Sequence, residues 1–257
     1  MSYIYKALGC CVIAALAVGC GGTDSSKSAE PSAPAAAPDA KKVDAGTAGN
    51  ITGKVVLEGT PPAPTTFKMT SDPACGAAEG HSESFVVDNG ALQNVFVYIK
   101  DGLGNKYIFD TPTEPVKLDQ KNCHYTPHVL GLRVTQPLEI VNSDNTMHNV
   151  HGMPETNREF NFGQIVAGMK NTVAFTTPEV MIPFKCDVHA WMNSYIGVVN
   201  HPYFAVTGTG GKFEMKTVPP GTYTIEAWHE KLGRQTQSVT LGEKDTKDIT
   251  FTFKAGA

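Results

Sequence analysis

The sequence lacks a basic excess, a long apolar run beyond its first twenty residues, and helical periodicity sustained over several turns. Acidic residues outnumber basic ones by 25 to 21. No basic stripe is therefore available to neutralise phosphates, and we expect no nucleic-acid partner. Neither paired carboxylates nor a nucleophile–base arrangement can be assembled from the residues, so we do not expect an enzyme.

What the sequence does contain is a set of short apolar–polar alternations typical of β-strands. They cover 51–56, 94–99, 204–207, 212–215, 223–227 and 249–253. Turn residues separate several of them, as in Gly208-Thr209-Gly210-Gly211 and Pro219-Pro220-Gly221. Because no helical segment competes with these strands, the pattern predicts an all-β protein.

The first nineteen residues have the pattern of an export signal. Lys6 gives a short positive start, and the apolar stretch 7–18 is too short to span a bilayer as a mature helix. The stretch ends in Ala17-Val18-Gly19-Cys20, which resembles the bacterial lipobox and implies lipid attachment at Cys20. The alternative is a plain secretory signal that is cut nearby.

Residues 20–49 are rich in Ser, Ala, Pro and Gly and predict a flexible tether. By analogy with Gram-negative lipoproteins, Gly21 after the lipidated cysteine favours the outer membrane. The expected location of the folded part is the periplasm or the cell surface, held to a membrane by its lipid anchor.

Three cysteines follow the leader, namely Cys75, Cys123 and Cys186. An oxidising compartment favours pairing, and an odd number leaves one thiol single. Cys75 and Cys123 both lie in predicted loops. If those two pair, the disulfide contributes about 4 kcal/mol on the chain-entropy model and Cys186 stays free.

Cys186 begins a group of potential metal ligands. His189 and Met192 follow it at spacings of three residues, on a short segment between the β-like runs 172–176 and 195–199. A thiolate, an imidazole and a thioether on such a turn can converge on one ion. His148 follows an alternating strand at 138–141 and offers a second imidazole.

These residues resemble the cupredoxins, the blue-copper family, and in the short last loop its amicyanin- and plastocyanin-like members. The motifs are Asn142-Ser143-Asp144, His148-Asn149-Val150 and Cys186-Asp187-Val188-His189-Ala190-Trp191-Met192. The resemblance covers residues 115–202 and implies a Greek-key β-sandwich. It also implies one copper ion, bound by His148, Cys186 and His189, with Met192 as the weak axial ligand.

The resemblance further implies a one-electron carrier. Asn149 would tie the two ligand loops together by hydrogen bonds, and the edge of His189 would lie near the surface in an apolar docking patch with Ala190 and Trp191. If these residues instead pack against another domain, the exit route is buried. A c-type cytochrome or a periplasmic dehydrogenase would be the redox partner.

The chemistry of the residues favours copper independently. Thiolate and thioether suit Cu(I), imidazole tolerates Cu(II), and a structural zinc site would want a fourth Cys or His. Asp187 replaces the Ser or Thr that family members often carry after the ligand cysteine, which leaves the redox tuning open. Whether His124, His128 or His151 binds a metal also stays open. Two alternative functions remain, copper delivery without redox cycling and a cell-surface scaffold.

A second resemblance lies towards the C-terminal end. Gly211-Lys212-Phe213 and Val218-Pro219-Pro220-Gly221-Thr222-Tyr223 resemble the carboxypeptidase regulatory-like domain, a transthyretin-like β-sandwich. Its opening strands would be those near residues 51 and 94. We therefore expect a discontinuous sandwich of 50–114 and 203–257 with the cupredoxin domain, 115–202, inserted into it. The simpler alternative is three sequential pieces.

Overall fold

The computed structural model describes residues 37–76 and 79–256. The predicted signal, Cys20 and the tether up to residue 36 lie outside these residues. The described part of the chain consists of strands with two short 3-10 turns, Pro73–Cys75 and Thr209–Gly211, and this confirms the predicted all-β class. Within the same residues, no helix has the length and apolar character needed to span a membrane.

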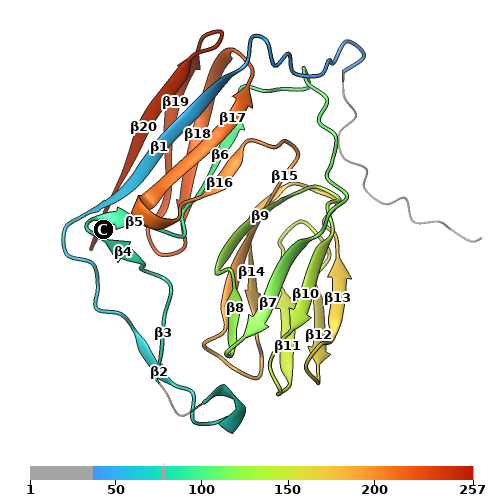
Figure 1. Cartoon of the computed structure of the whole chain (residues 1–257), viewed down its shortest axis with the longest axis vertical. Coiled ribbons are helices and arrows are strands. Elements are labelled where there is room, and N and C mark those ends of the chain that lie inside the picture. The colour runs from blue at the N-terminus through green and yellow to red at the C-terminus, as the bar shows by residue number, and fades with distance from the viewer. Residues whose placement is uncertain (1–36, 77–78, 257) are drawn as a thin grey trace, which may run out of the picture. The chain divides into compact units, whose positions relative to one another are not determined.

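The two ends of the described chain share one pair of sheets, which we call the terminal sandwich (Figure 1). In its first sheet, β1 (Gly49–Glu58) pairs antiparallel with β17 (Lys212–Val218) and β5 (Ala91–Leu92) and parallel with β20 (Thr246–Lys254), while β4 (Val87–Asp88) pairs with β5. The second sheet has the order β16 (Phe204–Val206), β6 (Phe96–Asp101), β18 (Gly221–His229) and β19 (Gly233–Leu241).

The strands between residues 116 and 199 form two further sheets, which we call the central sandwich (Figure 1). One has the order β13 (Lys170–Val173), β10 (Leu138–Asn142), β7 (Val116–Lys121) and β8 (His124–Thr126). The other has the order β12 (Phe160–Gln164), β11 (His148–Gly152), β14 (Glu179–Lys185), β15 (Asn193–Val199) and β9 (Val129–Arg133). Parallel pairs, β10 with β7 and β15 with β9, join strands that are distant in sequence.

Alternating side chains explain why these segments are strands. Along β1 the residues alternate between fully buried and more exposed, so that one face supplies Ile51, Val55 and Leu57 to the core. β6 differs because both of its faces are covered. Val97 and Ile99 enter the core of the terminal sandwich, while Phe96 and Tyr98 belong to a separate cluster with residues of the central sandwich such as Val129.

Two glycines make room for Phe96. Gly131 of β9 and Gly197 of β15 are register partners, and a Cβ atom on either would lie within 2.6 Å of the Phe96 ring. Non-bonded carbon atoms do not approach each other so closely, so a side chain at either position would displace the ring. These glycines therefore act through close packing and not through an unusual backbone conformation.

A long connection between β1 and β4 contains a small hairpin, β2 (Thr66–Lys68) with β3 (Glu79–His81). We call its described part, residues 66–76, the cap segment. Asp72 begins the short 3-10 turn by accepting a hydrogen bond from the Ala74 N–H. Cys75 at the end of that turn forms a disulfide with Cys123, and Cys186 is a free, buried cysteine. The disulfide thus fastens the cap segment to the central sandwich.

Candidate metal centre

The metal-binding motifs lie where adjacent strands of one sheet begin and end. β11 begins at His148, and residues 186–192 connect β14 to its antiparallel neighbour β15. Two backbone hydrogen bonds close this connection into a tight turn, from the Met192 N–H to the His189 carbonyl (2.9 Å) and from the Cys186 N–H to the Met192 carbonyl (3.1 Å). Because β11 pairs with the end of β14, His148 lies next to the turn.

His148, Cys186 and His189 converge at this point. The Nδ1 atoms of the two histidines are 3.0 Å apart, and the Cys186 sulfur lies 3.9 Å from His189 Nδ1. One potential ligand atom from each residue lies within 4.8 Å of the other two. All three side chains are at most 2% exposed. The group could therefore hold a metal ion away from solvent.

Each histidine is oriented by a carboxylate on its outer nitrogen. His148 Nε2 lies 2.8 Å from Asp144 Oδ2, and His189 Nε2 lies 3.2 Å from Asp72 Oδ2. The Nε2–H tautomer satisfies both contacts and leaves both Nδ1 lone pairs directed inward. Burial lowers the pKa of His148 in spite of the nearby Asp144, which favours the neutral, ligating imidazole.

The Cys186 sulfur accepts two backbone hydrogen bonds. The donors are the N–H groups of Asn149, at 3.3 Å, and of His189, at 3.4 Å. Donors directed at sulfur stabilise the thiolate that a metal would bind. Asn149 also joins the two ligand-bearing segments, because its Oδ1 accepts a hydrogen bond from the Asp187 N–H at 3.1 Å.

Met192 is 1% exposed and belongs to the apolar cluster that also contains Cys186. It ends the turn that begins at Cys186, so both residues extend from the same closed connection. Its thioether is thus held in an apolar setting beside the three converging residues, although burial alone also suits a core residue.

The cap segment covers His189. Cys75 Sγ lies 3.6 Å from His189 Nε2, and Asp72 also accepts a hydrogen bond from the Thr146 hydroxyl at 2.5 Å. His189 is consequently only 2% exposed. The expectation that its edge lies near the surface is wrong, because a chain segment from outside residues 115–202 lies over it.

Trp191 connects the buried histidine to the cap segment by ring contacts. Its ring centroid is 5.2 Å from that of His189 and 5.6 Å from that of Phe67, with which it stacks at an interplanar angle of 13°. The Trp191 Nε1–H donates to the Cys123 carbonyl at 3.0 Å, which fixes the indole next to the disulfide. Trp191 is therefore part of the cover and not an exposed docking residue.

Other histidines and acids named by the sequence are engaged elsewhere. His151 contacts Asp187 (3.1 Å) and Glu159 (2.6 Å), and His128 Nε2 contacts Glu230 Oε1 (2.5 Å) in the turn after β18. The Asp187 carboxylate is exposed, and a hydrogen bond from Lys185 holds its pKa below the ordinary value.

Sequence reasoning missed Asp72 and Asp144 as partners of the candidate ligands. Asp144 could have been found, because it stands four residues before His148 in a motif already singled out. Its carboxylate also accepts the N–H groups of Asn122 (2.7 Å) and Cys123 (2.8 Å), so one side chain joins a ligand histidine to the disulfide loop. No local signal marks Asp72, which is 117 residues from His189.

Comparison with protein-family models gives a match to polysaccharide lyase family 4, domain II, over residues 166–249. The match spans less than half of the chain and crosses from the central into the terminal sandwich, so it does not assign the chain to that family. No curated protein matches the chain significantly. The resemblance to the carboxypeptidase regulatory-like domain stays a prediction.

Among solved structures, the chain is similar to copper proteins over about a third of its length. A copper-containing nitrite reductase from Thermus scotoductus SA-01 is 22% identical, with coverage of 33% of this chain and 22% of that one and a TM-score of 0.31. A Cu(I) amicyanin variant is 17% identical, with coverages of 33% and 81% and a TM-score of 0.30. A purple cupredoxin from Nitrosopumilus maritimus is 18% identical, with coverages of 33% and 97% and a TM-score of 0.28. At these scores the similarity assigns neither a ligand nor an activity to this chain.

Proposed function

We propose that this protein binds a single copper ion at His148, Cys186 and His189, with Met192 as a weak axial ligand, and carries one electron. The observation that carries the proposal is the pair of inward-facing Nδ1 atoms, 3.0 Å apart, beside a free buried thiol. When both histidines hold their proton on Nε2, two lone pairs face each other without a hydrogen between them. A cation bound there removes the repulsion.

The donor set favours copper over zinc. Two imidazoles, one thiolate and a thioether suit both Cu(I) and Cu(II), whereas Met is a poor ligand for zinc and the group contains no fourth Cys or His. The sulfurs of Cys75 and Cys123 also lie near His189, but they are joined in a disulfide and cannot act as thiolates. The set therefore consists of Cys186 and the two histidines, together with Met192.

The protein residues would act mainly by holding the site in one geometry. Copper, when bound, would supply the one-electron couple between Cu(I) and Cu(II). Asp144 and Asp72 fix the orientation of the two imidazoles, and the N–H groups of Asn149 and His189 hold the sulfur. A buried site whose two imidazoles and thiolate are held from behind changes little between oxidation states, which is what an electron carrier requires.

The cap segment bears on how an electron would leave. With His189 covered, the ring sequence His189, Trp191 and Phe67 offers a path from the site to the half-buried face of Phe67. The same cover favours a second candidate function, copper storage or delivery without redox cycling, because a closed site retains its ion. Reversible reduction separates these two candidates.

The proposed setting is a lipoprotein attached at Cys20, with residues 20–49 as a tether and the folded part in the periplasm or at the cell surface. The support is the sequence pattern of the signal and tether. The proposed partner is a redox protein such as a c-type cytochrome or a periplasmic dehydrogenase. The apolar, half-buried face of Phe67, which covers Trp191, suits a small, transient redox interface.

The test is a visible absorption spectrum of the purified chain with one equivalent of Cu(II), beside a Cys186→Ser variant. We expect an intense thiolate-to-copper charge-transfer band that the variant lacks and that a reductant bleaches reversibly. A Met192→Leu variant should keep the band with a changed potential, because it removes only the axial ligand. A colourless native protein would refute the carrier. A band without reversible reduction would favour storage or delivery.

A further inference from the structure

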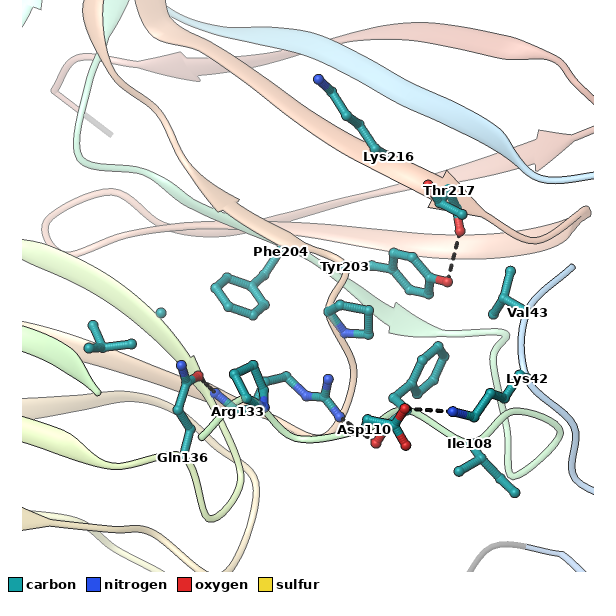
Figure 2. A pocket seen from close by; sticks show the side chains of 15 residues that line it. Lys42, Val43, Ile108, Asp110, Arg133, Gln136, Tyr203, Phe204, Lys216 and Thr217 are labelled. Carbon is teal, nitrogen blue, oxygen red and sulfur yellow. Dashed lines mark hydrogen bonds and ion pairs between the residues drawn. The ribbon is translucent and has the colours of Figure 1, made fainter. Parts of the chain in front are cut away.

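A second candidate site is a cavity of about 680 Å³ (Figure 2). This volume falls within the usual size of small-molecule sites, roughly 300–1,000 Å³. Its lining comes from segments near residues 42, 110, 133, 203 and 217, so both sandwiches contribute to it. None of the candidate metal ligands is among its lining residues.

Most of the wall is apolar and partly aromatic. The Phe109 and Tyr203 rings meet edge to face, with centroids 5.4 Å apart, and Ile108 is 42% exposed at the cavity. The apolar lining side chains include Val43, Ile108, Phe109, Pro202, Tyr203 and Phe204. A wall of this kind would cover a flat hydrocarbon or aromatic group.

Arg133 is the buried charge of this cavity and is only 5% exposed. Its Nη2 donates to the carbonyl oxygens of Asn200 (2.9 Å) and Phe109 (3.4 Å), while its Nε is buried and has no hydrogen-bond partner. In Figure 2 the side chain extends between Gln136 and Asp110. Its guanidinium therefore retains donor capacity that the described residues do not use.

No carboxylate among the described residues forms an ion pair with Arg133. Asp110, the acidic residue of the lining, is instead held by Lys42 at 2.7 Å, and Lys216 pairs with Glu214 at 3.2 Å. Burial lowers the pKa of Arg133, which reflects the cost of a cation without a close counter-ion. With Lys42 and Lys216 paired in this way, Arg133 is the basic residue of the lining that has no carboxylate partner among the described residues.

We propose that this cavity binds a small organic anion, a carboxylate attached to an aromatic or similarly apolar body. The carboxylate would accept hydrogen bonds from the Arg133 guanidinium and supply the missing counter-charge. The apolar body would lie against Phe109, Tyr203 and Phe204. Inorganic anions share the charge but would leave this wall uncovered, so the apolar body sets the ligand class.

The probe is 3-phenylpropanoate, titrated into the purified full chain by isothermal calorimetry with and without copper. Two matched compounds separate the contributions. 3-Phenylpropan-1-ol keeps the ring without the charge, and acetate or inorganic phosphate keeps a charge without the ring. We expect saturable binding of the carboxylate, and binding at least about tenfold weaker for each matched compound, since a charge-assisted hydrogen bond lost from a buried site costs at least that factor.

Three variants test the residue assignment. Arg133→Met should weaken binding about tenfold or more, whereas Arg158→Met, which removes an exposed arginine elsewhere, should leave it unchanged. If Arg133→Met fails to fold, Ile108→Glu provides the test, because it adds a carboxylate at an exposed position of the cavity and should repel the probe.

Several outcomes would overturn the proposal. These are no binding by the native chain, equal binding of the alcohol or of phosphate, and unchanged affinity in Arg133→Met or Ile108→Glu. Copper-dependent binding would place the probe at the metal centre and would also overturn it. Because the expected binding is independent of copper, the proposal stands or falls separately from the electron carrier.

Discussion

The central sandwich buries more polar side chains than the terminal sandwich does. The terminal sandwich includes four strands of nine or ten residues, β1, β18, β19 and β20, around a continuous apolar core. The central sandwich has strands of three to seven residues. Its interior combines apolar residues with a free thiol and polar side chains, namely Gln120, Asn142, His148, Gln164, His189 and Ser194.

This difference shows what a buried site demands of a β-sandwich. Every polar group removed from water needs a partner, and in the central sandwich those partners come from loops and from the cap segment as well as from the strands. The terminal sandwich buries fewer polar side chains, among them Thr207, Glu226 and His229, and it supplies the cap segment from the connection between β1 and β4. It also contributes Glu230, which contacts the buried His128.

The largest effect should come from releasing the cap segment. Replacing Cys75 and Cys123 together by Ser opens a loop of sequence separation 48, and the chain-entropy model gives a loss of about 4 kcal/mol in the free energy of unfolding. The measurement is urea unfolding, followed separately in Trp191→Phe and Trp228→Phe backgrounds, which leave one tryptophan in each sandwich. We expect the Trp191 transition to move and the Trp228 transition to move less.

The same double variant tests the cover over His189. Reagents that acylate imidazole should modify His189 in the metal-free variant and spare it in the native chain, with the site read by mass spectrometry. Dithiothreitol should reproduce the effect in the native chain and add nothing in the variant. An unprotected His189 in the native chain, or a stability loss under about 1 kcal/mol, would contradict this role of the disulfide.

The sequence predicted the strands better than it predicted what lies over them. The alternation at 51–56 lies within β1, because alternation encodes the burial of one strand face directly. The run at 94–99 overlaps β6, which begins at Phe96. The run at 172–176 is shorter in the structure, where β13 ends at Val173. Strand ends are less well encoded, since they depend on pairing with neighbours and not on periodicity.

In the candidate metal centre, too, the sequence predicted the ligand residues better than the segment that covers them. His148, Cys186 and His189 could be selected by residue type and spacing, and the structure brings them within 4.8 Å of each other. The contact of Asp72 with His189 could not be selected, because it depends on how a long connection folds back. Turn residues predicted a loop around Cys75, but the sequence of that loop does not predict which surface it covers.

A smaller effect should distinguish buried amides from exposed ones. Gln164 is fully buried in the central sandwich, where its amide contacts Gln120, the Ile140 carbonyl (3.0 Å) and Asn171 (2.9 Å). Gln164→Ala leaves those buried groups without a hydrogen-bond partner and without access to water. We therefore expect a loss of about 2 kcal/mol in the free energy of unfolding.

The matched control lies in the terminal sandwich. Gln237 donates to the Thr250 carbonyl at 2.6 Å where water can replace it, so Gln237→Ala should cost less than about 0.5 kcal/mol. Urea unfolding at neutral pH measures both. Equal losses in the two variants would mean that a buried amide of the central sandwich contributes no more stability than an exposed amide of the terminal sandwich. The proposed difference between the two sandwiches would then be wrong.

The smallest effect concerns pH and the buried histidine His201. Its Nε2–H donates to the Ile99 carbonyl at 2.8 Å and its Nδ1 accepts the Tyr203 N–H at 3.2 Å, so the neutral ring satisfies both contacts. Burial, with a smaller contribution from the charge of Arg133, lowers its pKa to about 4. The unfolded chain, with an ordinary histidine pKa of about 6.5, therefore binds one more proton than the folded chain between these values.

Stability from His201 is thus complete above about pH 6.5 and is lost progressively as the pH falls towards 4. His201→Gln keeps a donor and an acceptor but cannot titrate, so its loss of stability between pH 6 and pH 5 should be about 1 kcal/mol smaller than in the native chain. His81→Gln, at an exposed histidine, should leave the native slope intact. Equal slopes for native and His201→Gln proteins would show that His201 is not held neutral in the folded chain.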